Sequence, residues 1–327
     1  MRVVAIGGGT GLSTLLRGLK EKVGHEIKDL SAIVTVADSG GSTGRLRKTY
    51  HIPAPGDIRN CIVALSESEE VMQELFQYRF KGGELDGHAF GNLFIVALTD
   101  ITSSFLSAIN IASQILRTKG EIIPATLTDI QLCARFSNGK VVCGEEEITE
   151  YGKRHEASLQ EIWIEPRDAK APIDAVAKIE SADVIIFGPG SLYTSIIPNL
   201  LIEDIRSAIE RSRALRIFVV NAMTQPGETD HFSASDHIKA FLKHTGIGKV
   251  DVAIVNTRMP NNEVLRRYLQ QGQEPVVPDV ANIARMGIEV YTEDLIGEKE
   301  DFVRHDPRRL ANLIVDIFRR HEAFSEL

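Results

Sequence analysis

A short apolar strand that runs straight into a glycine loop occurs twice near the start of this 327-residue chain, and this feature limits its fold most. Val3–Ile6 leads into Gly-Gly-Gly-Thr-Gly at residues 7–11, and Ala32–Ala37 leads into Asp-Ser-Gly-Gly-Ser-Thr-Gly at residues 38–44. Because glycine has no side chain, it lets backbone N–H groups and a helix N-terminus point directly at an anion. Two such loops at the ends of two early strands predict a nucleotide-binding α/β protein.

In the C-terminal half of the chain, predicted helices alternate with short apolar strands. Three predicted helices, at 173–181, 202–211 and 233–244, each precede an apolar run, at 183–187, 216–220 and 250–255. Runs of this kind are typical of parallel strands that are buried on both faces. We therefore expect a Rossmann-like, doubly wound and mostly parallel α/β sheet that binds ligands at the carboxyl ends of its strands.

The N-terminal half contains mostly helical patterns and one region with a strand-turn-strand pattern. Helices are expected over 12–22, 57–66 and 71–78, followed by one long helix over about 92–117. Two strand-like runs flank Ser137–Gly139, which has the composition of a hairpin turn. The chain is therefore expected to form a single domain over 1–327, with a small β-hairpin insertion at about 121–165.

The composition argues against several classes of protein. There are 37 basic and 45 acidic residues, and the net charge of −8 argues against a general nucleic-acid surface, which needs clustered Lys and Arg. No apolar run reaches the roughly 18 residues of a membrane span, and the first strand begins too early to leave room for a signal peptide. Cys61, Cys133 and Cys143 are odd in number and widely spaced, so we expect neither a disulfide framework nor a zinc site. These features together predict a cytoplasmic protein.

The glycine loops differ from the commonest nucleotide-binding motifs. The loop at 7–11 lacks the Gly-Lys-Ser/Thr ending of a P-loop, so no lysine is placed for a γ-phosphate. Leu12 stands where the third glycine of the dinucleotide-binding fingerprint would fall. A P-loop ATPase is therefore improbable, and a nicotinamide-dependent oxidoreductase is disfavoured.

Polar side chains elsewhere offer candidates for catalysis. Asp57 precedes a helix, where it would act as a cap or take part in chemistry, and Arg59 is placed to reach a phosphate with two N–H groups. His88 and Asn92 flank Gly91, and His88 would either make a structural hydrogen bond or contact a ligand. Asp38, Asp57 and His88 are the catalytic candidates. Asp38, Asp57 or a bound diphosphate could hold magnesium, although no metal motif of fixed spacing is present.

Six motifs in the same order together resemble the YvcK/CofD-like family over nearly the whole chain. They are the two N-terminal glycine loops, Pro55–Arg59, His88–Asn92, Gly188–Ser191 and Thr224–Thr229. The residues of the second and last motifs are similar to those of the YvcK branch, the gluconeogenesis factors. This resemblance implies a Rossmann-like fold, UDP-sugar binding and a role in cell shape and peptidoglycan supply on gluconeogenic carbon sources.

The resemblance also assigns binding roles to residues of this sequence. The loops at 8–11 and 188–191 would hold a phosphate, and Asp38 would take a ribose or sugar hydroxyl or a metal. Tyr268 would stack on a ring and Arg304 would pair with a diphosphate. Asn221 and Gln225 would recognise the base or the sugar through hydrogen bonds from their side-chain amides. The full expected nucleotide-sugar site comprises Gly8, Gly9, Thr10, Gly11, Asp38, Ser42, Thr43, Arg59, Asn92, Gly188, Pro189, Gly190, Ser191, Asn221, Gln225, Tyr268 and Arg304.

The sequence leaves two functions open. The first is a UDP-sugar-binding regulatory protein, because the loops lack an evident nucleophile or general base. The second is a magnesium-dependent transferase that uses a nucleotide-diphosphate donor, like 2-phospho-L-lactate transferase, since phosphate chemistry depends mainly on positioning and charge. A second copy of the chain and regulatory proteins of the cell envelope are the partners to test.

Overall fold

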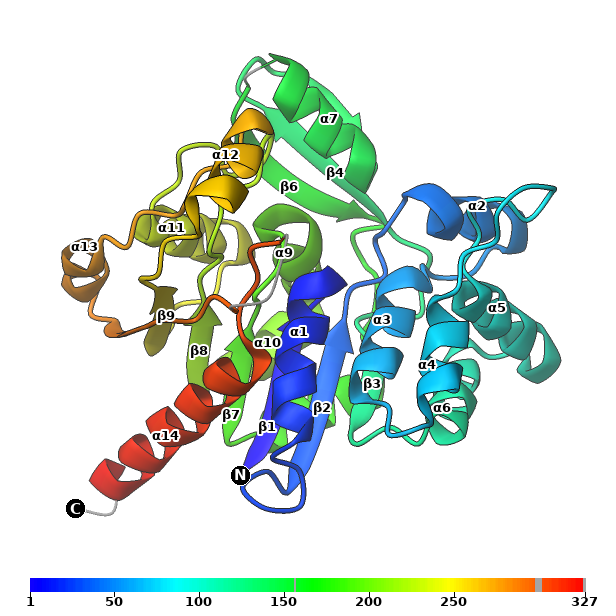
Figure 1. Cartoon of the computed structure of the whole chain (residues 1–327), viewed down its shortest axis with the longest axis horizontal. Coiled ribbons are helices and arrows are strands. Elements are labelled where there is room, and N and C mark those ends of the chain that lie inside the picture. Colours follow the sequence, from blue (N-terminus) through cyan, green and yellow to red (C-terminus); the bar gives the residue numbers. More distant parts are fainter. Residues whose placement is uncertain (156, 298–301, 326–327) are drawn as a thin grey trace.

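A seven-stranded parallel sheet forms the centre of the protein, seen in a computed structural model that describes residues 1–155, 157–297 and 302–325 (Figure 1). The strand order is β10-β9-β8-β7-β1-β2-β3. All six neighbouring pairs are parallel, as the sequence predicts for apolar runs buried on both faces. The strands are β1 (Arg2–Gly7), β2 (Asp29–Val34), β3 (Glu121–Pro124), β7 (Val184–Phe187), β8 (Leu215–Val219), β9 (Val252–Asn256) and β10 (Glu289–Glu293).

The strand order contains one reversal, between β1 and β7. From β1 the chain moves outward through β2 to β3, and then returns to β7 on the other side of β1 before moving through β8 and β9 to β10. Right-handed crossovers place the helices of the two halves on opposite faces of the sheet, which leaves a crevice where the direction reverses. Doubly wound proteins bind ligands at this crevice, so the fold puts a candidate site above β1 and β7.

Helices cover both faces of the sheet. In the first half α1 lies between α3 and α14 (Figure 1), and in the second half α8 packs against α10. The helices, including one π-helical turn, are α1 (Gly9–Lys20), α2 (Gly41–Tyr50), α3 (Gly56–Leu65), α4 (Glu70–Gln77), α5 (Phe90–Thr102), α6 (Phe105–Ile115), α7 (Glu145–His155), α8 (Ile173–Ser181), η1 (Leu192–Ile196), α9 (Ile197–Leu200), α10 (Glu203–Arg211), α11 (Ala234–Thr245), α12 (Asn262–Gln270), α13 (Val280–Arg285) and α14 (Pro307–Ser325).

A second, three-stranded antiparallel sheet stands beyond the upper edge of the large one in Figure 1, with α7 beside it. It is formed by β4 (Gln131–Phe136), β5 (Val141–Cys143) and β6 (Leu159–Glu165) in the order β5-β4-β6. The hairpin expected around Ser137–Gly139 is therefore present, and β6 includes the expected strand at 162–164. The small sheet begins at Gln131, because β3 pairs with β2 and belongs to the large sheet.

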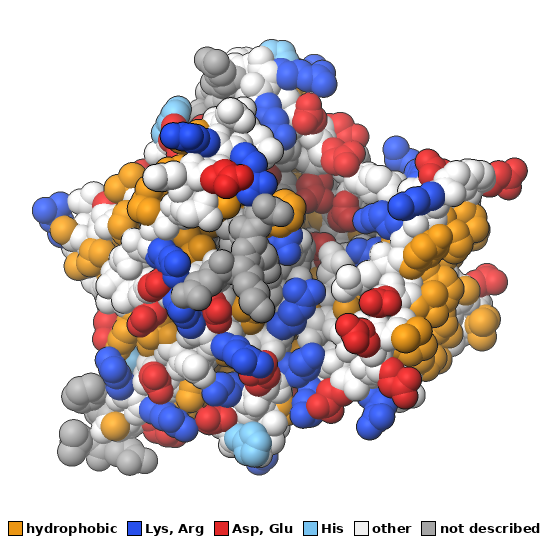
Figure 2. Space-filling view, viewed as in Figure 1, with side chains coloured by type: hydrophobic (Ala, Val, Ile, Leu, Met, Phe, Trp, Pro, Cys, Tyr) orange, Lys and Arg blue, Asp and Glu red, His pale blue; other side chains and the backbone are white. Residues whose placement is uncertain are grey.

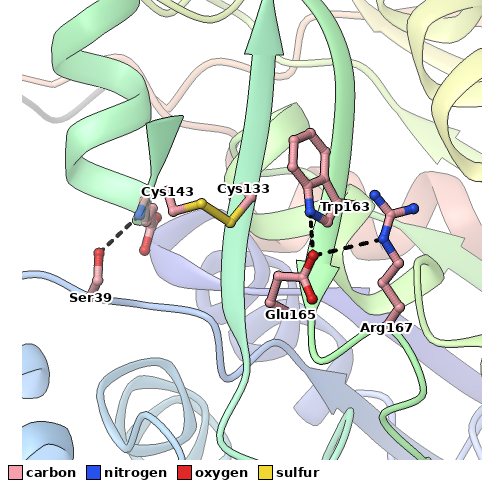
Figure 3. The surroundings of a disulfide bond; sticks show 7 residues. Ser39, Cys133, Cys143, Trp163, Glu165 and Arg167 are labelled. Atoms are coloured by element: carbon pink, nitrogen blue, oxygen red, sulfur yellow. Dashed lines mark hydrogen bonds and ion pairs between the residues drawn. A yellow bond between two sulfur atoms is a disulfide. The ribbon is translucent and has the colours of Figure 1, made fainter. Parts of the chain in front are cut away.

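The expectation that the chain has no disulfide is wrong. Cys133 and Cys143 are joined by a disulfide that links β4 to β5 (Figure 3). The physical reason is the hairpin register, which sets these two residues directly opposite each other. Cys61 is a free, buried thiol in α3, as an odd cysteine count requires.

Two helix boundaries also differ from those expected. Residues 41–50 form α2, although the glycines and hydroxyl residues there have the composition of a loop. The long helix expected over about 92–117 is two helices, because Ser103 takes a left-handed conformation with φ of 51°. Ser104 then caps α6 by accepting a hydrogen bond from the Ser107 N–H, so a Ser-Ser pair ends one helix and starts the next.

None of the helices that the described residues form combines the length and the apolar character that crossing a membrane requires.

Candidate nucleotide-binding site

A pocket of about 330 Å³ lies at the reversal point of the sheet. Loops that follow β1, β7 and β8 form its base, while α12 and the segment before α14 contribute its other side. It is lined by Gly8, Gly9, Thr10, Gly11, Thr14, Pro189, Gly190, Ser191, Ser195, Asn221, Ala222, Met223, Thr224, Gln225, Tyr268, Gln273, Val303, Arg304 and His305. Backbone groups, hydroxyls and amides predominate in this lining, which suits a phosphate-bearing ligand.

The first loop leads directly into α1. Gly9 has a φ of 61°, a left-handed conformation that favours glycine, and no acidic side chain occupies the first turn of α1. The helix N-terminus therefore directs the positive end of its dipole at the pocket, while the N–H of its first residue, Gly9, donates to the Asp57 carboxylate. A Cβ on Gly11 would collide with the carbonyl of Pro189, so glycine is also required where the first loop packs against the second.

Two amide side chains hold the loops after β7 and β8 together. The Asn221 Nδ2 donates to the carbonyl oxygen of Gly190 at 2.7 Å, and its Oδ1 accepts from the Gly190 N–H at 3.0 Å. The Gln225 Nε2 donates to the Ser191 hydroxyl at 2.6 Å, while the buried Gln225 Oε1 has no partner in the described part of the chain. Asn221 thus positions the loop that follows β7, and Gln225 keeps one unpartnered acceptor at the pocket within the described residues.

The third side of the pocket comes from the C-terminal region. The Tyr268 hydroxyl of α12 accepts a hydrogen bond from the Val303 N–H at 2.9 Å, which ties α12 to the segment that carries Arg304. The Arg304 guanidinium lies over the Phe302 ring, 5.3 Å from its centroid. His305 is buried, and burial lowers its pKa to about 4, so it is neutral at physiological pH. Since His305 is neutral, the positive charge on this side of the pocket comes from Arg304, which could pair with a phosphate.

A separate group of carboxylates is buried behind the first loop. Asp57 accepts a hydrogen bond from the Gly9 N–H, but burial, followed by repulsion from Asp38, raises its pKa to about 7. Burial also raises the pKa of Glu228 to about 7, although it accepts hydrogen bonds from Thr149 and Thr194. Burial and the other three carboxylates raise the pKa of Glu145 well above its usual range. Burial therefore favours the protonated form of Asp57, Glu145 and Glu228.

Ser42, His88 and Asn92 form a hydrogen-bonded cluster where α2 meets α5. The Ser42 hydroxyl lies 3.2 Å from both the His88 Nδ1 and the Asn92 Nδ2. Burial and the nearby Arg45 lower the pKa of His88, which favours the neutral ring. Arg59 is buried close by in α3, with two guanidinium N–H groups, Nε and Nη1, unpartnered within the described residues.

The structure divides the residues singled out from the sequence into two sets. The first lines the pocket: Gly8, Gly9, Thr10, Gly11, Pro189, Gly190, Ser191, Asn221, Gln225, Tyr268 and Arg304. Gly188 directly precedes Pro189, one of these lining residues, in the chain. The second set lies outside the pocket lining, in the carboxylate group and the cluster under α2 and α5: Asp38, Ser42, Thr43, Asp57, Arg59, His88 and Asn92.

Sequence reasoning missed several residues that the fold brings in. Thr14 lies one helical turn after Thr10, Ser195 follows the Gly188–Ser191 motif by four residues, and Thr224 begins the Thr224–Thr229 motif. Helical spacing and the neighbouring motifs therefore held a signal for them. Glu145 and His305 carried no such signal. Glu145 is the first residue of α7, directly after β5 of the small sheet. The fold brings it to the carboxylate group although it lies far from Asp38 in the sequence.

Asp38 and Asp57 are the carboxylates expected from the sequence to hold magnesium. Among the described residues no group of three or more His, Cys, Asp or Glu side chains is placed to hold a metal ion. Magnesium often binds through only one or two carboxylates, completed by water and by substrate phosphates. Asp38 and Asp57 interact closely enough for one to raise the pKa of the other, so they fit the protein's share of such a site.

Comparison with known proteins identifies the family. The family model described as 2-phospho-L-lactate transferase CofD matches residues 3–296. The chain belongs to the CofD family. A Bacillus subtilis protein named "Gluconeogenesis factor" is 43% identical over 97% of this chain and 98% of its own length.

Two further relatives agree with this assignment. An Aquifex aeolicus protein named "Putative gluconeogenesis factor" is 66% identical over 97% of this chain and 96% of its own length. The crystal structure of a Bacillus halodurans member of the UPF0052 family superposes with a TM-score of 0.91 at 41% identity, covering 96% of this chain and 98% of that one. These likenesses confirm both the resemblance noted in the sequence and the expected α/β fold.

Proposed function

We propose that this CofD-family chain is a gluconeogenesis factor that binds a UDP-sugar in the pocket above β1 and β7. The observation that carries the proposal is the convergence of two glycine loops, the N-terminus of α1 and the Arg304 guanidinium on one pocket. The backbone groups suit one phosphate and the guanidinium suits another. The unpartnered Gln225 Oε1 adds an acceptor for an N–H or O–H group of the ligand.

The protein would act by binding rather than by turnover. The pocket lining contains hydroxyl, amide and backbone groups, and its histidine, His305, is buried and neutral. Bound UDP-sugar would then report the supply of peptidoglycan precursors during growth on gluconeogenic carbon sources. Cell shape would depend on that signal through proteins of the cell envelope.

The test is calorimetric titration with UDP-N-acetylglucosamine, UDP-glucose and GDP, each with and without magnesium. We expect micromolar binding of a UDP-sugar with no release of UDP after prolonged incubation. The Arg304→Ala variant should weaken binding about 10- to 100-fold, because a charged hydrogen bond contributes about 1.5–3 kcal/mol. Arg285→Ala, which removes an exposed arginine of α13, is the matched control and should bind normally.

Failure would take one of two forms. No measurable binding of any of the three nucleotides would reject the nucleotide pocket itself. Equal loss of affinity in Arg304→Ala and Arg285→Ala would instead reject the role of Arg304 while leaving the pocket in place.

A second candidate function is a magnesium-dependent transfer from a nucleotide-diphosphate donor. The half-buried pair of Asp38 and Asp57 favours it, since these carboxylates lie beside the first glycine loop and would share a magnesium ion with the donor. Bound magnesium would neutralise phosphate charge during transfer. Steady release of nucleotide that requires magnesium and disappears in Asp38→Asn would establish this function against pure binding.

A further inference from the structure

The disulfide between Cys133 and Cys143 lies at the edge of the small sheet (Figure 3). Strand β5 pairs only with β4, over three positions, whereas β4 also pairs with β6 over six positions. Neither cysteine belongs to the main apolar core that the described residues form. Opening the bridge would therefore free a short edge strand and leave β4 and β6 paired, so the protein can stay folded with the bridge closed or open.

The two cysteine side chains differ in accessibility. Cys133 is 2% exposed, whereas Cys143 is half-buried. A thiolate can therefore approach the Cys143 sulfur more readily, which makes the Cys133 sulfur the leaving group. Disulfides that a thiol can reach in the folded protein are the labile ones that serve in regulation.

The bridge lies next to the contact between α7 and the loop before α2. Glu145, the first residue of α7, follows Cys143 by two positions, and its N–H donates to the Ser39 hydroxyl at 2.9 Å. One residue further on, the approach is closer still, since a Cβ on Gly40 would lie 2.5 Å from the Glu146 carboxylate. Any movement of β5 is thus passed directly to the loop that carries Asp38.

Like charges oppose this contact. The first turn of α7 consists of Glu145–Glu147, and Figure 2 shows acidic side chains gathered over α7 and in the hollow beside it. Burial, followed by repulsion from Asp38, Asp57 and Glu228, raises the pKa of Glu145. Repulsion of this kind pushes the start of α7 away from the loop at Asp38. The bridge is a covalent tether that resists this separation.

We propose that the Cys133–Cys143 bridge is a reversible redox switch, opened by a dithiol reductant, that controls how closely Glu145 is held to Ser39 and the carboxylate group. One thiolate of the dithiol attacks the Cys143 sulfur, breaks the S–S bond and releases Cys133 as a thiolate, which takes up a proton. The second thiol of the reductant then attacks its own bound sulfur and releases Cys143 as a thiol. The bridge gains two electrons and two protons, and the dithiol loses them and becomes a disulfide.

Trp163 gives a direct readout of the bridge. It is the single tryptophan of the chain, and it stands opposite Cys133, so it shares one face of the small sheet with both cysteines. Its indole N–H donates to the Glu165 Oε1 at 2.8 Å, and the Arg167 guanidinium lies 5.2 Å from its ring centroid, so the ring has a fixed place beside the bridge (Figure 3). Because a disulfide quenches the fluorescence of a neighbouring indole, emission should rise when the bridge opens.

The first test follows Trp163 emission while the protein equilibrates in mixtures of reduced and oxidised dithiothreitol. Mass spectrometry after thiol alkylation counts the open bridges, and circular dichroism verifies the fold. We expect emission to rise as the bridge opens and to return on reoxidation, with the protein folded throughout. The double variant Cys133→Ala and Cys143→Ala is the control that should not respond, and Cys61→Ala should respond like the unmodified protein.

Two results of this test would overturn the proposal. A bridge that opens only when the protein unfolds would be a structural bond and not a switch. Two free thiols in every mixture would mean that the bridge does not form. Both results concern the small sheet alone, so they leave the proposed nucleotide pocket untouched.

Hydrogen exchange of the Glu145 N–H, resolved by NMR, tests the effect on the carboxylate group. We expect this N–H to exchange about tenfold or more faster in the reduced protein than in the oxidised protein. Ser39→Ala removes the hydroxyl that accepts from Glu145, so in this control the exchange should be fast in both redox states. Equal exchange in the two states of the unmodified protein would overturn the control of Glu145 by the bridge.

Single variants test which sulfur is attacked. Cys133→Ser leaves the half-buried Cys143 thiol, which should form a mixed disulfide with oxidised glutathione that mass spectrometry detects. Cys143→Ser leaves the buried Cys133 thiol and is the matched control, which should react about tenfold or more slowly. Equal rates in the two variants would reject attack at Cys143.

Discussion

The two sides of the α1 N-terminus use opposite chemistry. On the pocket side the chain offers backbone N–H groups, neutral amides and the Arg304 guanidinium. On the side of α3 it buries Asp57 beside Asp38, with Glu145 and Glu228 close by. The Gly9 N–H donates to Asp57, so the helix N-terminus that faces the pocket also stabilises a carboxylate behind it.

If the pocket holds a phosphate as proposed, its affinity should depend on the charge of the carboxylate group. A phosphate near Gly8–Gly11 would meet favourable N–H groups, but the Asp57 and Asp38 carboxylates would repel its charge. A proton on Asp57 or a cation between the acids removes that repulsion. The predictions below separate the two sides, in order of decreasing expected effect.

The largest effect is expected from Asp57→Asn, measured as the free energy of unfolding against pH. The folded protein raises the pKa of Asp57 from 3.8 to about 7, so the native state holds a proton that the unfolded chain releases. This contribution to stability is therefore present at low pH and is lost as pH rises from about 4 through about 7. The asparagine keeps an acceptor for the Gly9 N–H without the charge, so at pH 8 we expect it to stabilise the protein by roughly 2–4 kcal/mol.

Chemical denaturation at pH 5 and pH 8 tests this prediction. The advantage of Asp57→Asn should shrink at the lower pH, because Asp57 of the unmodified protein is then protonated. Glu203→Gln, which changes an exposed acid in α10, is the control and should show no such pH-dependent advantage. An advantage of Asp57→Asn that is equal at both pH values would mean that Asp57 is not protonated in the native state.

The second largest effect is expected from removing the disulfide with Cys133→Ala and Cys143→Ala together. A bridge that closes a short loop stabilises a protein by about 2–3 kcal/mol by restricting the unfolded chain. Cys143 lies two residues before Glu145, whose N–H donates to the Ser39 hydroxyl at 2.9 Å (Figure 3). The loss should therefore loosen the small sheet and the carboxylate side, while the pocket side keeps its affinity.

Hydrogen exchange with and without UDP-N-acetylglucosamine distinguishes the two sides in this double variant. We expect faster exchange in β4, β5 and α7 and unchanged exchange in the loop at Gly188–Ser191. Cys61→Ala, which removes the thiol outside the bridge, serves as the control. Faster exchange in both regions alike would show that the small sheet and the pocket are not independent.

The residues whose common location could be predicted from sequence lie on the pocket side. Gly8–Gly11 and Pro189–Ser191 line one pocket, as expected from glycine loops that follow neighbouring strands of a parallel sheet. The carboxylate side was only partly predictable. Asp38 and Asp57 stand in motifs, but Glu145 joins them only through the fold of the small sheet. The disulfide was missed because its cysteines look unrelated until the hairpin register sets them opposite each other.

Local conformation explains the other differences. The glycines and hydroxyl residues at 41–44 have the composition of a loop, yet tertiary packing holds them in α2, where Ser42 is buried against His88. The break at Ser103–Ser104 depends on one left-handed residue and one cap, which a long apolar pattern conceals. Boundaries set by single capping residues are harder to predict than the strands of the buried sheet.

The third effect tests the pocket side through Asn221→Ala. This change removes two hydrogen bonds to the backbone of Gly190, so we expect the protein to lose about 1–2 kcal/mol of stability. The affinity for UDP-N-acetylglucosamine should fall about tenfold, because the phosphate loop is then less well ordered. Calorimetry and thermal melting give the two values, and an unchanged affinity would mean that the loop holds its shape without Asn221.

The smallest effect is expected from Tyr268→Phe, and it separates two roles of one side chain. The change removes only the hydroxyl that accepts the Val303 N–H, so stability should fall by about 1 kcal/mol or less. If the ring itself contacts the ligand, Tyr268→Phe keeps most of the affinity and Tyr268→Ala loses it. If the hydroxyl matters because it positions Arg304, both variants weaken binding alike, and adding either change to Arg304→Ala costs little more. The second result would make α12 part of the positioning of the guanidinium, and Arg304 would then depend on a contact between elements that are not adjacent in the sequence.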